Sequence, residues 1–97
     1  MTGDPMGRGL IADQLRSSLA AAVGLPATDA DSIGMLIDAG ELGIALETLC
    51  TQIYEYDIEV DGPQRSRLEA LGMALSVPVA YLLGDPWAAP PDQKGPR

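Results

Sequence analysis

The sequence predicts an all-α protein, a compact bundle of about four helices followed by a disordered C-terminal tail. Four segments repeat apolar residues at steps of three and four, the spacing that gathers side chains on one face of a helix. Glycine and proline separate these segments, and the period-two pattern of strands is essentially missing. With 97 residues, the chain makes one small domain at most.

The first helix is expected within residues 8–23, because its apolar positions recur at steps of four, four and three. These positions are Ile11, Leu15, Leu19 and Ala22. Asp4 and Pro5 are candidates for a cap and a first-turn proline upstream. Gly24 and Pro26 mark its end, since these residue types commonly terminate helices.

A shorter second helix should begin among the capping candidates at residues 28–31 and end at Gly40. Its apolar residues are Ile33, Leu36 and Ile37. The third helix, residues 41–56, has the clearest pattern, with apolar positions at alternating steps of four and three over four turns. These positions are Leu42, Leu46, Leu49, Ile53 and Tyr56. We therefore expect this helix at the centre of the bundle, with Tyr56 in the core.

A fourth helix is expected after an extended link, because Pro63 suits a helical first turn and an apolar face follows it. That face consists of Leu68, Leu71 and Leu75. Residues 79–84 should add one further turn or a short helix. The resulting organisation is a flexible N-terminus at residues 1–7, a helical domain at 8–84 and a Pro-rich disordered tail at 85–97.

Acidic residues outnumber basic ones by 14 to 6, which gives a net charge of −8 and a pI near 4.1. Between residues 17 and 64 there are nine acids and no Lys or Arg. The nine are Asp29, Asp31, Asp38, Glu41, Glu47, Glu55, Asp57, Glu59 and Asp61. Such a concentration repels nucleic acid and favours a cationic partner, although a solubilising acidic surface is the simpler alternative.

The chain contains no His and one cysteine, Cys50. Catalytic Ser-His-Asp and Cys-His arrangements are therefore excluded, as are imidazole or thiolate metal sites and an intramolecular disulfide. No apolar stretch is long enough for export or membrane insertion, so we expect a cytoplasmic protein without membrane association. Nothing supplies a substrate pocket or an oxyanion donor, and we expect no enzyme activity and no cofactor.

The acidic link after the third helix partly matches a calcium-binding EF-hand loop. Asp57, Glu59, Asp61 and Gly62 occupy positions one, three, five and six of that pattern. Position twelve is Leu68 instead of the bidentate Glu. We therefore expect no metal site, and interpret these acids as helix caps and linker carboxylates.

The polar side of the third helix and the link after it form the candidate partner-binding surface. Tyr54 is the candidate anchor, because a rigid amphipathic ring among carboxylates suits an interface with Arg and Lys residues. Packing on the fourth helix is the alternative for this ring. Ile44 projects toward the polar side, where it either meets the first helix or is an exposed apolar contact. The candidate contact residues are Ile44, Glu47, Thr51, Tyr54, Glu55, Asp57 and Glu59.

Residues 40–75 contain a Gly-Glu opening, an aliphatic-Ala-Leu-Glu run at 44–47, the strings Leu-Cys and Tyr-Glu-Tyr-Asp, and a following amphipathic helix. This combination, over about a third of the chain, resembles the MafI-family immunity proteins of bacterial polymorphic toxin systems. The resemblance implies a small helical protein that binds and neutralises a cognate toxin domain, often a nuclease, in the producing cell. A nuclease is cationic where it grips phosphates, so an acidic protein can cover that surface.

Two other functions are alternatives to an immunity protein. Residues 67–85, RLEALGMALSVPVAYLLGD, resemble the last helices of repressor-type helix-turn-helix regulators, which implies a DNA-binding module. Against this, the region before Pro63 lacks a basic recognition helix and would turn nine acids toward phosphate. A generic acidic protein-binding adaptor is the other alternative. The expected partner is a basic toxin domain, and the sequence leaves the oligomeric state open.

Overall fold

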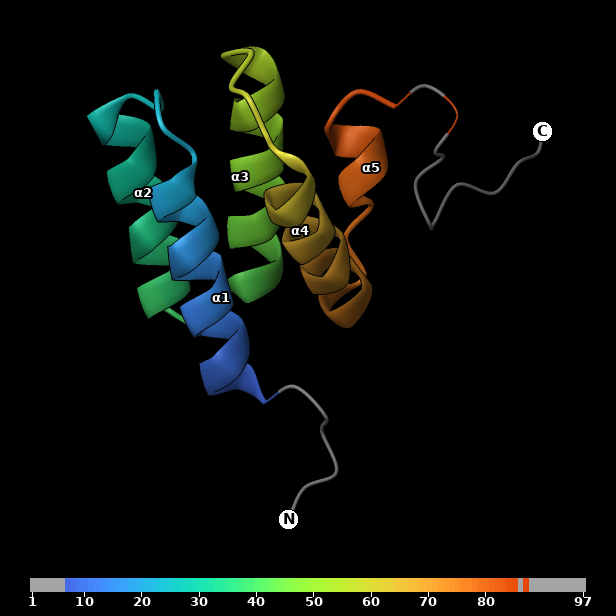
Figure 1. The fold of residues 1–97 in the computed structure, drawn as a ribbon. Helices are drawn as coiled ribbons and strands as arrows, with labels where there is room; N and C mark the ends of the chain where they lie inside the picture. The colour runs from blue at the N-terminus through green and yellow to red at the C-terminus, as the bar shows by residue number, and fades with distance from the viewer. Residues whose placement is uncertain (1–6, 86, 88–97) are drawn as a thin grey trace, which may run out of the picture.

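The computed structural model describes residues 7–85 and residue 87 (Figure 1). The helices of this part of the chain are α1 (Arg8–Ala21), α2 (Ala27–Asp38), α3 (Leu42–Glu55), α4 (Gly62–Leu75) and the short α5 (Val79–Leu82). The predicted all-α class and bundle of about four helices are confirmed. Within the described residues, no helix combines the length and apolar character needed to cross a bilayer. The predicted flexible N-terminus and tail lie outside the described residues, apart from Gly7, Asp85 and Trp87.

The helices form two layers. One layer contains α1 and α4, which contact each other and lie in front in Figure 1. The other contains α2, α3 and α5, with α3 in the middle. Because α3 contacts each of the other four helices, its predicted place at the centre of the bundle is confirmed.

The core draws more residues from α3 than from any other helix. The buried residues of α3 are Leu42, Ala45, Leu46, Leu49, Cys50 and Ile53. Leu15 of α1 and Leu68 of α4 belong to the same cluster and are fully buried. Complete burial of one such leucine contributes about 1.5–3 kcal/mol to folding. The apolar side of α3 is therefore a main source of the protein's stability.

The helix ends explain how the layers are joined. Asp61 caps α4, where its carboxylate accepts a hydrogen bond from the Gln64 backbone N–H at 2.9 Å, and Pro63 occupies the first turn as expected. At the other end of α4, a Cβ on Gly72 would come within 2.6 Å of the Val77 carbonyl oxygen. Glycine at this position thus lets the chain fold back closely, which brings α5 against α3.

Three local expectations are wrong. The first helix begins at Arg8 with Gly7 as its N-cap, and not with the expected cap and first-turn proline at Asp4 and Pro5, which lie outside the described residues. The second helix begins at Ala27, with Pro26 as its N-cap at φ −58°, so the proposed caps at residues 28–31 lie inside the helix. The fixed φ of proline is already suited to starting a helix, and no side-chain cap is needed. Tyr56 is 47% exposed and not in the core; it is the C-cap of α3, one residue beyond the last helical residue. Ile58 packs against the core instead.

Candidate partner-binding surface

The side of α3 that faces away from the core carries five of the seven candidate contact residues. We call this the outer face of α3, and it consists of Ile44, Glu47, Thr51, Tyr54 and Glu55. These residues follow one another at steps of three or four, or one within the last turn, so they share one side of the helix. Ile44 is 49% exposed and Tyr54 59%, whereas Thr51 is half-buried. Of the two positions expected for Ile44, the exposed one is correct.

The two remaining candidates lie in the loop after α3 and point to different places. Asp57 borders a hollow together with Tyr54, so it extends the outer face of α3. Its φ of 53° is in the left-handed region, which Asp tolerates better than most residues. Glu59 borders a separate hollow with Ala21 and Val23, beside the end of α1. The structure therefore groups six of the candidates and sets Glu59 apart.

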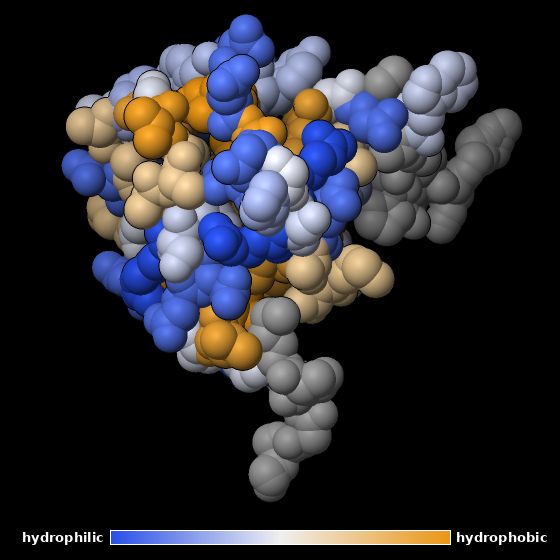
Figure 2. Space-filling view, viewed as in Figure 1, coloured by the Kyte–Doolittle hydropathy of each residue, from blue (hydrophilic) through white to orange (hydrophobic). Residues whose placement is uncertain are grey.

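Opposite charges separate between the two layers. Within the described residues, the four arginines all belong to α1 and α4, whereas α2 and α3 carry acids and no basic residue, and α5 carries no charged residue. The arginines are Arg8, Arg16, Arg65 and Arg67. Figure 2 views the α1 and α4 side, where polar residues cover the middle and apolar residues gather at the upper and lower ends. The outer face of α3 consequently carries acids and no basic residue of its own, and Arg65 of α4 lies at its edge, in the hollow that Tyr54 and Asp57 border.

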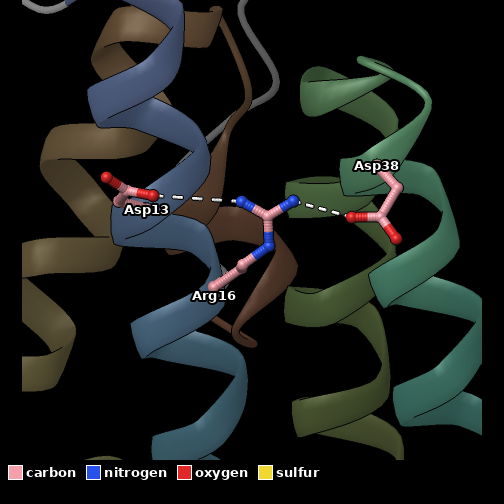
Figure 3. A network of polar contacts seen from close by, with 3 residues as sticks. All are labelled: Asp13, Arg16 and Asp38. Carbon is pink, nitrogen blue, oxygen red and sulfur yellow. Dashed lines mark hydrogen bonds and ion pairs between the residues drawn. The ribbon is translucent and has the colours of Figure 1, made fainter.

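Ion pairs offset part of the acidic charge of α2, but not that of the outer face of α3. Arg16 of α1 donates to Asp38 of α2 at 2.7 Å and approaches Asp13 at 3.9 Å (Figure 3). All three side chains are largely exposed, and such pairs contribute about 0–1 kcal/mol. Among the described residues, Glu47 and Glu55 have no ion-pair partner. Their charges therefore remain available to a partner.

The ring of Tyr54 lies against Gly84, just after α5, and it borders a hollow with Arg65 of α4. A Cβ on Gly84 would come within 2.6 Å of Tyr54 Cε1, so the ring rests directly on the Gly84 backbone. Gly84 has a φ of 103°, a conformation that favours glycine. Tyr54 is thus an exposed aromatic residue whose position is fixed by a close contact.

Two ionisable groups among the described residues have shifted pKa values. Burial raises the pKa of the Cys50 thiol to about 12, against a smaller lowering by Arg65, so the thiol stays protonated at neutral pH and is a poor nucleophile. A hydrogen bond to Asp29 raises the pKa of Tyr56. Within the described residues, no three His, Cys, Asp or Glu side chains lie close enough together to hold a metal ion.

Sequence reasoning missed the contribution of α5 to this surface. Tyr81, Gly84 and Asp85 border a hollow of about 350 Å³ together with Tyr54 and Thr51. They are separated from Tyr54 by about thirty positions, and helical spacing gives no information about contacts at that distance in the chain. The one available signal was Gly84 after an apolar turn. A glycine there marks the end of a helix, but it does not show which other part of the chain that end contacts.

Comparison of the chain with protein-family models, with curated proteins and with solved structures finds no match. The interpretation of the outer face of α3 therefore depends on its shape, charge and exposed residues. Exposed aromatic residues that are held in place and surrounded by polar groups are typical anchors of protein interfaces. The outer face of α3 has this character at Tyr54.

Proposed function

We propose that this protein is an immunity protein that binds a cognate toxin domain, with a basic contact surface, and neutralises it. The outer face of α3, together with Asp57, is the contact surface. Tyr54 and Ile44 supply apolar contact area, and Glu47 and Glu55 attract and orient the toxin domain. The likeness of residues 40–75 to MafI-family immunity proteins suggested this class of partner, and a nuclease is one such toxin.

The separation of charge between the layers is the observation that carries the proposal. Self-repulsion among acids on one side destabilises the monomer, and a cationic partner relieves it. Complementary charge of this kind mainly accelerates association and suppresses wrong partners. An even spread of the same charges would give solubility without a preferred binding side.

The regulator alternative receives less support. A DNA-binding protein needs cations on the side that approaches phosphate. The arginines of α1 and α4 are the available cations, yet Arg16 is paired with Asp13 and Asp38, and Arg65 with Glu69 at 3.1 Å. No described observation favours DNA over a protein partner.

Co-expression tests the proposal. The test uses a basic toxin domain encoded in an adjacent reading frame. Cells that produce it should survive when the parent protein is co-expressed and die without it. The purified proteins should form a complex that elutes as one species on size exclusion. Death of cells that contain both proteins at comparable levels, or separate elution, would refute the proposed function.

A matched pair of variants locates the contact surface. Ile44 lies on the outer face of α3, and Met73 is an exposed apolar residue of α4 in the other layer. Each is replaced by Lys, which adds the same charge at an exposed helical site. Ile44→Lys should abolish protection while keeping the parent circular dichroism spectrum, and Met73→Lys should protect fully. The reverse pattern would place the contact surface on the α1 and α4 layer.

A further inference from the structure

A shallow hollow lies between the last turn of α3 and α5. We call it the tyrosine hollow, and its lining residues are Thr51, Tyr54, Tyr81, Leu82, Gly84 and Asp85. Its volume is about 350 Å³, and it is open to solvent on one side. Tyr54 and Tyr81 are both exposed, at 59% and 46%. Two aromatic rings from different helices thus border one open site.

The tyrosine hollow is preorganised on the Tyr54 side. The ring rests on Gly84, where any Cβ would collide with Cε1 at 2.6 Å and with Cδ1 at 2.9 Å. An exposed tyrosine normally loses rotamer freedom when a partner immobilises it, which weakens binding. Because the Gly84 contact already restricts Tyr54, part of that cost is removed before the partner arrives.

The charge around the tyrosine hollow has one sign. Among the described residues, Asp85 lines it, and no Lys or Arg does. One carboxylate oxygen of Asp85 accepts a hydrogen bond from the Trp87 backbone N–H at 2.9 Å, which orients the carboxylate. The neighbouring hollow on the other side of Tyr54 does contain Arg65, together with Asp57. The tyrosine hollow is therefore the more favourable of the two for a cation.

We infer that the tyrosine hollow receives an arginine side chain of the partner protein, an inference that rests on the proposed function and specifies its contact. The guanidinium stacks on the faces of Tyr54 and Tyr81 and donates hydrogen bonds to the Asp85 carboxylate. Arginine fits better than lysine, because its planar and weakly hydrated cation stacks on aromatic rings. The apolar stem of the side chain packs against Leu82.

Peptide binding tests this inference without the toxin. Octa-arginine and octa-lysine carry equal charge, so the acidic surface alone attracts them similarly. Isothermal titration of the full chain at low salt should show octa-arginine binding about two- to fivefold more tightly, the range that an exposed cation–π contact provides. The amide NMR resonances of Gly84 and Asp85 should shift with octa-arginine. Equal affinities, or no binding of either peptide, would overturn the inference.

Three variants with unchanged charge localise the effect. Tyr54→Leu and Tyr81→Leu should each reduce the arginine preference toward unity. Tyr56→Leu is the matched control, because Tyr56 is 47% exposed but does not line the hollow, and it should keep the parent ratio. A preference that survives both hollow variants would refute the arginine site while leaving the co-expression result, and with it the proposed function, unaffected.

Discussion

The inner and outer faces of α3 differ in what contacts them, although they belong to the same helix. Leu46, Leu49 and Cys50 on the inner face are fully buried, in a helix that contacts every other helix of the bundle. Ile44 and Tyr54 on the outer face are about half exposed or more. The contrast indicates that stability depends on one face and recognition on the other, so substitutions should affect the two properties separately.

The largest expected effect is on the inner face. Leu49→Ala should lower the free energy of unfolding by about 2–5 kcal/mol, because it removes buried methyl groups and leaves a cavity. Ile44→Ala on the outer face is the matched control and should cost less than about 1 kcal/mol, since half of that side chain is already in water. Urea unfolding measures both. Equal losses of unfolding free energy in the two variants would mean that the outer face contributes as much to stability as the inner face.

An intermediate effect is expected from Cys50 at alkaline pH. Its pKa is about 12 in the folded protein and 9.0 in the unfolded chain, so above pH 9 the unfolded chain releases a proton that the folded protein keeps. Cys50 therefore has little effect on the pH dependence of stability well below pH 9, and its ionisation should lower the free energy of unfolding by up to about 1.4 kcal/mol per pH unit between pH 9 and 12. The raised pKa of Tyr56 acts in the same direction.

Thermal melts of the parent and Cys50→Ala at pH 8 and pH 10.5 measure the Cys50 contribution. The variant should lose less stability over this interval than the parent, because the ionising thiol is gone while the tyrosines remain. The same decrease in both proteins would show that Cys50 is not the group responsible.

The inner face of α3 could be predicted from the sequence, because regular helical spacing identifies it directly. The same logic failed at Tyr56, where a helix end, which the pattern alone does not locate, removed the residue from the stripe. The outer face of α3 also followed from spacing, whereas the tyrosine hollow beside it was missed. The contribution of Tyr81, Gly84 and Asp85 to that hollow depends on how closely α4 folds back at Gly72, which is a tertiary contact.

The smallest effect on stability, and the most specific effect on recognition, is expected on the outer face. Glu47→Lys combined with Glu55→Lys should change the free energy of unfolding by no more than about 0.5 kcal/mol per site, because both side chains are exposed and lack an ion pair among the described residues. Asp57 is unsuited to this test, since Lys at a φ of 53° adds backbone strain. Asp13→Lys on α1 is the control in the opposite layer.

Association kinetics on immobilised toxin domain separate these variants. The Glu47 and Glu55 double variant should associate about tenfold more slowly, with a smaller change in dissociation, because its charges now repel the partner during encounter. Raising the ionic strength should slow the parent more than the variant, since salt screens exposed charges beyond about 8 Å at physiological concentration. Asp13→Lys should associate at nearly the parent rate. Asp13→Lys reverses one charge, whereas the double variant reverses two. If Asp13→Lys slowed association by as large a factor per reversed charge as the double variant does, net charge and not the outer face of α3 would govern the encounter, and the two faces would differ in stability alone.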